Sequence, residues 1–342
     1  MVLDNEDRVL QASAAARAFG LVSGDQLVVQ ELLALARQVR RDGEIREGEL
    51  DVSTTGVHRR VTSLAVRAAP LDAAVGGGGL VLLLVEDQTE SRRVEEVRRD
   101  FVANTSHELK TPVGALALLA ETVEDAADDP EAVRRFASRM RQEAARLTNL
   151  VQDMITLSRI QAAEPIPDPV PVQLDDVVAE ALDRCRMKAS ARGIDLVALG
   201  EDGLSVLGDE DLLVTALRNL LENAVAYSPD KTRVDVSTRQ AAADAVEISV
   251  ADQGIGIPER DLERIFERFY RVDPARSRAT GGTGLGLAIV KHVTAAHGGK
   301  VTVVSSEGEG STFTLRLPLR LDAVTVRRHR TGDGAIRQEA VK

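Results

Sequence analysis

Residues 94–157 carry two long series of apolar or small residues spaced three and four apart, which predicts two amphipathic helices. The polar stretch DAADDP at 125–130 separates them as a tight turn. A lone helical hairpin leaves its apolar seam half covered, so we expect two copies to pair as a four-helix homodimer. The seam positions are Val94, Val97, Phe101, Thr105, Leu109, Val113, Leu116, Ala120 and Val123, then Val133, Phe136, Met140, Ala144, Leu147, Val151, Met154 and Leu157.

Residues 1–86 show the short periods of a small α/β unit. The segment VLDNEDRVLQAS reads as two strands around a polar turn, followed by the short helix AAARAFG. Residues 61–69 alternate in polarity, and LVLLLV at 80–85 suits a buried strand. The tetraglycine before that strand leads into no helix and no Lys-Ser/Thr pair, which favours a hairpin loop over a phosphate cradle.

The C-terminal half alternates helical and strand patterns and predicts a compact α/β domain over 173–318. A linker at 161–172 with four prolines precedes it. Residues 319–342 have no clear period and are predicted to be a disordered tail. Its basic cluster RRHR is a solvated segment or a docking element. Helices are expected at 174–192 and 209–226, and strands at 233–238, 246–252, 300–305 and 312–317.

Composition narrows the function classes. The 342 residues suffice for two or three domains, and the net charge of -11 disfavours nucleic-acid binding. A single cysteine, Cys185, excludes an intramolecular disulfide and a cysteine-built zinc site. The histidines are scattered and predict no metal cluster: His58, His107, His292, His297 and His329.

The longest apolar run, at 80–85, is too short to cross a membrane, and the polar residues soon after Met1 do not form a signal peptide. We therefore expect this chain to be cytoplasmic. A full-length form that is anchored in the cell membrane upstream of residue 1 stays an open alternative.

The stretch FVANTSHELKTP places a histidine on the first long helix. His107 lies two residues, roughly 200°, from the seam positions Thr105 and Leu109, so it should face solvent. Thr111 is one helical turn further on the same face, and the adjacent Glu108 can polarise one ring nitrogen. Pro112 should bend the helix nearby. This arrangement favours a reactive histidine over a core residue or a metal ligand.

A second group of candidate functional residues begins on the helix at 209–226, where Asn219 and Asn223 lie off the line of leucines that are expected to be buried. An exposed Asn pair alone is typical of a protein surface. Farther along, Asp252 ends a strand before Gly254 and Gly256, and the stretch GGTGLGLAIV at 281–290 opens a helix whose free N–H groups can hold phosphates. The ordered set is far more specific than any one glycine motif.

Residues 92–318 resemble the transmitter region of bacterial sensor histidine kinases. SHELKTP resembles the H box, RNLLENAVAYS the N box, DQGIGIP the G1 box, FERFYR the F box and GTGLGLAIV the G2 box. Two longer stretches are similar to actinobacterial sensor kinases that respond to phosphate limitation. Residues 1–86 are similar to a PAS domain. The resemblance implies a multidomain α+β protein: a PAS-like domain at 1–86, a dimeric helical hairpin at 87–160, and an α/β sandwich of the GHKL ATPase type at 173–318.

The resemblance also implies roles. His107 would take the γ-phosphoryl group of ATP with Glu108 as general base, pass it to an aspartate of a response regulator receiver domain, and Thr111 would position water for dephosphorylation. Asp252 would bind adenine and Asn223 would hold Mg²⁺. Residues 257–281 would form a mobile ATP lid. The remaining nucleotide contacts would be Asn219, Tyr227, Gly254, Gly256, Arg268, Arg271, Gly282, Thr283, Gly284, Leu285 and Gly286.

One position departs from the family pattern. Many members carry Lys or Arg three residues after the second N-box Asn, where this chain has Ala226. Positive charge for the phosphates would then come from Mg²⁺, the lid arginines or Lys291. Two other classes remain as alternatives. One is a GHKL-type ATPase, which has no H box and uses a carboxylate where this chain has Asn219. The other is a phosphatase-dominant or non-catalytic signalling scaffold.

Overall fold

The computed structural model describes residues 1–54, 60–71, 79–162, 166–273 and 282–319. The chain divides into two compact units, Met1–Thr105 and Ser106–Lys342. Three predictions lie outside the described residues: the tail after residue 319, the loop at 72–78 with most of the tetraglycine, and the environment of His58. In the described part of the chain, no helix combines the length and apolar character that crossing a bilayer requires.

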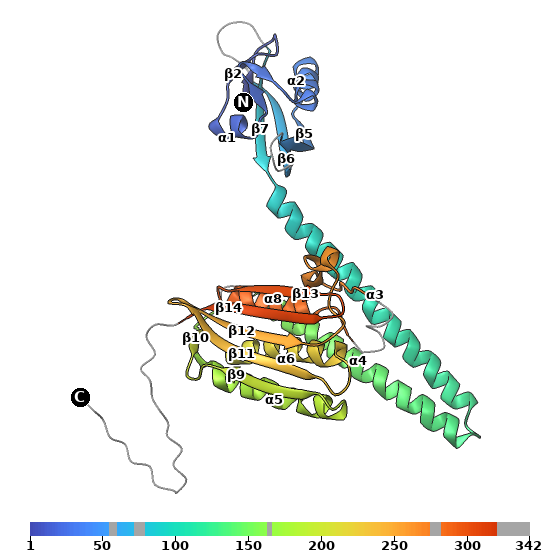
Figure 1. The fold of residues 1–342 in the computed structure, drawn as a ribbon. Coiled ribbons are helices and arrows are strands. Elements are labelled where there is room, and N and C mark those ends of the chain that lie inside the picture. The colour runs from blue at the N-terminus through green and yellow to red at the C-terminus, as the bar shows by residue number, and fades with distance from the viewer. Residues whose placement is uncertain (55–59, 72–78, 163–165, 274–281, 320–342) are drawn as a thin grey trace. The chain divides into compact units, whose positions relative to one another are not determined.

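The first unit is built on an antiparallel five-stranded sheet with the order β2-β1-β7-β6-β5 (Figure 1). Leu3, Leu64 and Leu83 of the sheet form the core with Leu32 and Val39 of the longer helix. The structure confirms the two strands predicted within residues 2–13, the short helix after them, and the strands at 61–69 and 80–85. Helix α2 and strand β5 are not among the predicted elements. The elements are β1 Val2–Leu3, β2 Val9–Gln11, α1 Ala14–Ala18, β3 Val22–Ser23, β4 Gln26–Leu27, α2 Gln30–Asp42, β5 Arg46–Thr54, β6 Arg60–Leu71 and β7 Leu80–Asp87.

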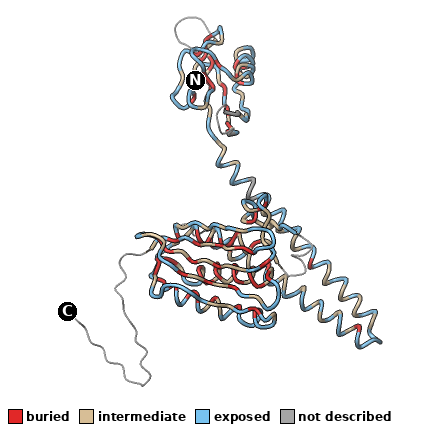
Figure 2. The backbone as a smooth tube through the Cα atoms, viewed as in Figure 1, coloured by how far each residue is buried: buried red, intermediate tan, exposed pale blue. Residues whose placement is uncertain are grey.

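The predicted helical hairpin is present as α3 (Thr89–Asp125) and α4 (Pro130–Ala162), and α3 continues through Pro112 without interruption. Asp129 caps α4, because its carboxylate accepts hydrogen bonds from the N–H groups of Glu131 and Ala132 at 3.0 Å. Figure 2 shows that the hairpin residues are mostly half-buried or exposed in the single chain. The seam is therefore only partly covered within one chain, as the heptad-like spacing predicts.

The C-terminal domain places three helices against a five-stranded sheet with the order β13-β14-β12-β11-β9 (Figure 1). Strand β9 pairs parallel with β11, and the other strand pairs are antiparallel. All predicted helices and strands of this domain are confirmed. Its elements are β8 Val170–Gln173, α5 Leu174–Ala191, β9 Asp195–Gly200, β10 Ser205–Gly208, α6 Glu210–Tyr227, β11 Arg233–Ala242, β12 Ala245–Asp252, η1 Glu259–Asp261, η2 Arg264–Phe266, α8 Gly286–Ala296, β13 Lys300–Ser306 and β14 Gly310–Pro318.

Two parts of this domain differ from the sequence-based expectation. Strands β9 and β10 are additional elements, and β10 pairs with β8, so the end of the proline-rich segment at 161–172 lies in a strand. On α6, Leu213, Leu217 and Leu221 are buried as expected, whereas Leu212 is only half-buried. Because β8 begins at Val170, the segment between α4 and β8 contains fewer residues than the predicted linker at 161–172.

His297 closes the end of α8 against the start of α6. Its Nε2 accepts a hydrogen bond from the Asp209 N–H at 3.0 Å, and its Nδ1 donates to the Val293 carbonyl at 2.8 Å. A Cβ on Gly208 would lie 2.1 Å from the ring, so only glycine fits there. The acceptor role of Nε2 requires the neutral imidazole, and burial lowers the pKa of His297.

We expect acid to destabilise the protein through His297. A histidine whose pKa is lowered by folding stabilises the folded state above its unfolded pKa, and this contribution falls as pH drops below about 6.5. The free energy of unfolding of the parental protein in urea should therefore decrease as pH falls below about 6.5, at up to about 1.4 kcal/mol per pH unit. A His297→Gln variant should show a smaller slope over that window. Equal slopes in both proteins would contradict the assignment.

Candidate nucleotide and phosphoacceptor site

Helix α6 presents Asn219, Asn223 and Tyr227 at intervals of four residues along one line. Asp209 caps the helix, because its carboxylate accepts the Leu212 N–H at 3.0 Å. The expectation of an exposed Asn pair is wrong for Asn219, which is 8% exposed and donates its amide to the Thr215 carbonyl at 2.9 Å. Asn223 and Tyr227 are half-buried. The burial of Asn219 arises from its contact with a second helix.

That helix is α8, whose first residue Gly286 faces Asn219. A Cβ on Gly286 would lie 2.7 Å from the Asn219 side-chain oxygen. The glycine therefore lets the N-terminus of α8 approach the asparagine line of α6. Because the first N–H groups of a helix have no intrahelical acceptors, this close approach brings anion-binding donors beside Asn219.

A Gly286→Ala variant is expected to weaken nucleotide binding about tenfold or more. The added methyl group must displace either Asn219 or the start of α8, since 2.7 Å is shorter than a van der Waals contact. Gly48→Ala in β5 is the matched control, because no atom lies within 4 Å of the corresponding Cβ. Titration with MgADP by calorimetry measures both variants. Parental affinity in Gly286→Ala would contradict the role of this contact.

Asp252 lies at the end of β12 in a turn that leaves one carboxylate oxygen for a ligand. Its Oδ1 accepts the N–H groups of Gly254 at 2.7 Å and Ser311 at 3.3 Å. Among the residues that the structure describes, no hydrogen bond to Oδ2 is formed. Burial raises the pKa of Asp252 in spite of these two hydrogen bonds. A half-buried acceptor of this kind suits an amino group on a flat ring.

The G1-box glycines serve close packing between protein segments. A Cβ on Gly254 would lie 2.9 Å from the Tyr227 carbonyl oxygen, so the end of α6 abuts the Asp252 turn. Gly256 has φ of +69°, and its Cβ would lie 1.9 Å from the Ser306 carbonyl oxygen. The close approach of a flat ligand to Gly254 and Gly256 stays a prediction.

The F-box and G2-box segments contact each other through their backbones. Phe269 has φ of 63°, and its N–H donates to the Gly284 carbonyl at 2.8 Å. Gly284 has φ of +75°, and a Cβ there would lie 2.9 Å from the Phe269 Cα. A non-glycine residue at positive φ costs free energy, which the surrounding contacts must offset. Phe269, inside the predicted lid at 257–281, is thus held against the glycine-rich turn that follows the lid, while residues 274–281 between them lie outside the described residues.

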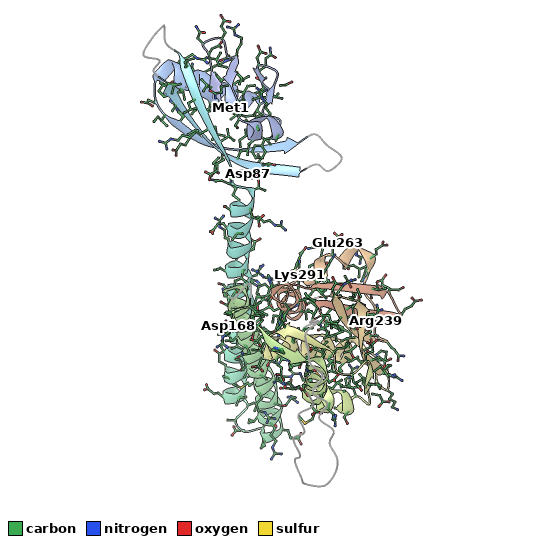
Figure 3. The ribbon with its side chains drawn as sticks, turned by 90° about the vertical axis from the view of Figure 1, so that its left-hand side faces the viewer. Met1, Asp87, Asp168, Arg239, Glu263 and Lys291 are labelled. Carbon is green, nitrogen blue, oxygen red and sulfur yellow. The ribbon has the colours of Figure 1, made fainter. Side chains whose placement is uncertain are left out.

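Side-chain contacts order the first part of the predicted lid. The Tyr270 hydroxyl donates to Asp261 at 2.7 Å, and the Arg264 guanidinium lies 4.3 Å from the Tyr270 ring centroid. Arg268 is half-buried, lies 3.4 Å from Nε2 of His292, and has its pKa lowered by burial. Lys291 on α8 is exposed (Figure 3).

His107 is exposed on α3, as its helical phase predicts. The Thr111 hydroxyl donates to the His107 carbonyl at 3.3 Å. Glu108 is half-buried and forms an ion pair with Arg271, Nη2 to Oε2 at 2.9 Å. The Arg271 side chain is only 9% exposed, so this ion pair is largely shielded from water. The proposed base and a proposed phosphate contact therefore meet directly.

Sequence reasoning missed Asp153 of α4. Its carboxylate accepts the Thr283 hydroxyl at 2.7 Å, and that hydroxyl accepts the Leu285 N–H at 3.2 Å. Burial raises the pKa of Asp153. Leu285 is fully buried, and Gly282 is half-buried. An isolated Asp on a charged helix gives no local signal of this contact, which joins residues 130 positions apart.

Comparisons with known proteins agree with this geometry. Residues 97–163 match the family model of the His Kinase A (phospho-acceptor) domain. Residues 208–321 match the histidine kinase-, DNA gyrase B-, and HSP90-like ATPase family. The H box lies in the first match, and the N, G1, F and G2 boxes lie in the second.

Similar proteins carry sensor-kinase names. The chain is 54% identical over 237 residues to the sensor-like histidine kinase SenX3 of Mycolicibacterium smegmatis, covering 69% of this chain and 62% of that protein. It is 47% identical over 322 residues to SenX3 of Mycobacterium tuberculosis, covering 94% and 78%. The phosphate regulon sensor protein PhoR of Pseudomonas aeruginosa is 39% identical over 235 residues, covering 68% and 53%.

A solved structure of the histidine kinase ThkA in complex with the response regulator protein TrrA shares the fold. It is 21% identical, with a TM-score of 0.53, and covers 93% of this chain and 94% of that chain. An exposed histidine on a helical hairpin, followed by an α/β domain with these five boxes, agrees with both family matches. The chain therefore belongs to the sensor histidine kinase family of two-component systems.

Proposed function

We propose that His107 is autophosphorylated by ATP and passes the phosphoryl group to an aspartate of a response regulator receiver domain. The observation that carries this proposal is the exposed His107 beside a carboxylate that Arg271 of the F box holds. This contact links the phosphoacceptor helix to the domain with the glycine-rich turn. Family membership supports the same assignment.

The described residues fit a purine nucleotide. Asp252 provides an acceptor for the adenine amino group, and Tyr227 lies at the end of the neighbouring helix. The N-terminus of α8, with Thr283 and the glycines around it, provides donors for phosphates. Arg268 and Arg271 supply positive charge in place of the basic residue that is missing at Ala226.

Mg²⁺ fits the same site through Asn223. No group of three or more His, Cys, Asp or Glu residues among the described residues could hold a metal ion. An ion that takes most of its ligands from phosphates and water needs few protein ligands, and a carbonyl oxygen of Asn223 is of the kind that Mg²⁺ accepts. The ion would neutralise phosphate charge during transfer.

In the reaction, a ring nitrogen of His107 attacks the γ-phosphorus while the bond to the β–γ bridging oxygen breaks, releasing ADP. Glu108 takes the imidazole proton, for which it must first leave its ion pair with Arg271. The freed guanidinium can then interact with phosphate oxygens. The exposed Thr111 hydroxyl, one turn from His107, supports a phosphatase role in positioning water toward a phosphorylated receiver.

The remaining assignments concern assembly and signal input. The half-covered seam of α3 and α4 supports a homodimer with a four-helix bundle. The antiparallel sheet with α1 and α2 supports a PAS-like sensor domain at 1–86, and the likeness to PhoR supports phosphate limitation as the signal. A membrane anchor upstream of residue 1 belongs to the same proposal.

Incubation with γ-labelled ATP and Mg²⁺ tests the proposed function. The label should be acid-labile and alkali-stable, as expected for a phosphorylated imidazole, and should move to a cognate receiver domain that is added afterwards. Release of labelled phosphate without a labelled protein would instead indicate a GHKL-type ATPase. The absence of both label and hydrolysis would indicate a non-catalytic scaffold.

A further inference from the structure

The last turn of α6 carries carbonyl groups that its own helix cannot satisfy. Ser228 caps the helix in an extended conformation, and Pro229 follows. The usual partner of the Val225 carbonyl would be the N–H of residue 229, and proline has none. An external donor is therefore needed at this end of the helix.

Arg192, the residue that caps α5, supplies these donors. Its Nη1 donates to the Val225 carbonyl and, at 3.2 Å, to the Ala226 carbonyl, and its Nη2 donates to the Ser228 carbonyl at 2.8 Å. Its Nε donates to Asp230 at 2.9 Å. One guanidinium thus contacts three carbonyls within four residues, and its positive charge faces the negative end of the helix dipole.

The backbone of Arg192 strengthens the same contact. Its carbonyl accepts the Lys231 N–H at 3.1 Å, and the next residue, Gly193, has φ of +63° with its Cβ position 3.4 Å from the Lys231 side chain. The segment after α6 therefore contacts both the side chain and the backbone of Arg192. The Asp230 carboxylate is 67% exposed, so its ion pair contributes little beside the carbonyl contacts.

The fourth carbonyl of this turn points to the proposed nucleotide site. The Tyr227 carbonyl oxygen lies against Gly254, where a Cβ would approach it to 2.9 Å and the Asp252 Oδ1 to 2.7 Å. The last turn of α6 is therefore held between the guanidinium on one side and the Asp252 turn on the other.

We propose that Arg192 is a positioning residue for nucleotide binding, which sets the end of α6, and with it Tyr227 and Asn223, against the Asp252 turn. The proposal rests on the proposed function, because it assigns the adenine end of the site to this turn. Arg192 acts through these residues and does not itself contact the nucleotide. Substitution of Arg192 would free the last turn of α6 and displace the residues that bind the nucleotide.

A purely structural role predicts a different result, since loss of the three hydrogen bonds to carbonyls would lower stability and leave the folded site intact. The test is the dissociation constant for MgADP of the full chain, measured by calorimetry well below the unfolding temperature of each variant. Arg192→Gln should raise this constant about tenfold, and Arg192→Lys, which keeps the charge but loses the planar fork, should lie between it and the parental protein.

Two control variants distinguish a positioning role of Arg192 from a purely structural one. Arg186→Gln removes an exposed ion pair with Asp183 on the same helix and should bind as the parental protein does. Val234→Ala, in the buried part of β11, should lower the unfolding temperature and leave the dissociation constant unchanged. Parental affinity in both Arg192 variants, or an equal loss in Val234→Ala, would overturn the proposal. If the parental protein itself binds no nucleotide, the proposed function fails instead.

Discussion

Substitution of His107 by glutamine should abolish stable labelling of the protein by γ-labelled ATP. Glutamine is neutral and of similar size, but its amide is not a nucleophile that can accept a phosphoryl group. Because His107 is exposed, the change should leave folding unaffected. We expect a loss of at least about 1,000-fold in acid-labile label, which is equivalent to about 4 kcal/mol of activation free energy.

The binding of MgADP provides the internal control for this variant. His107→Gln should bind MgADP within about twofold of the parental protein, because the nucleotide contacts lie on other elements. Glu108→Gln should be intermediate, with a labelling rate lowered about 100-fold, as expected for loss of a general base. Equal labelling of His107→Gln and the parental protein would place the phosphoacceptor elsewhere in the chain.

Substitution of Asp252 by asparagine should strongly weaken nucleotide binding with little change in the fold. The asparagine Oδ1 can still accept the N–H groups of Gly254 and Ser311, so the turn keeps both hydrogen bonds. The free oxygen, however, becomes an NH₂ group that opposes the adenine amino group, donor against donor. Loss of a hydrogen bond to a charged group together with an unpaired donor predicts affinity about 100-fold weaker.

Asp244→Asn is the matched control, since this residue lies in the exposed turn that leads into the same strand β12. Calorimetric titration with MgADP should show parental affinity for Asp244→Asn and weak binding for Asp252→Asn. Because burial raises the pKa of Asp252, acidification should weaken the binding of MgADP to the parental protein already at a pH above the range in which aspartates usually titrate. Normal binding by Asp252→Asn would remove the adenine assignment.

Several elements of the fold follow from local sequence. The hairpin helices and α6 repeat apolar residues at the helical period, because each must bury one face along its whole length. The strands β11, β12 and β14 alternate for the same reason on a sheet. Strand β9 escaped prediction because it lies at the sheet edge, where all of its residues are half-buried or exposed, and its sequence DLVALG does not alternate in polarity.

Motif order in the sequence also predicted which residues carry the chemistry: His107 outside the seam, and the Asn, Asp and glycine boxes in a fixed succession. Only the tertiary structure decided how these residues meet. Asn219 is buried because Gly286 lets α8 approach it, Glu108 pairs with Arg271, and Asp153 holds Thr283. Such contacts join residues far apart in the chain and impose no period on the residues between them. Arg192 illustrates the same limit, because its role depends on three carbonyl groups, and a carbonyl is present at every position of any sequence.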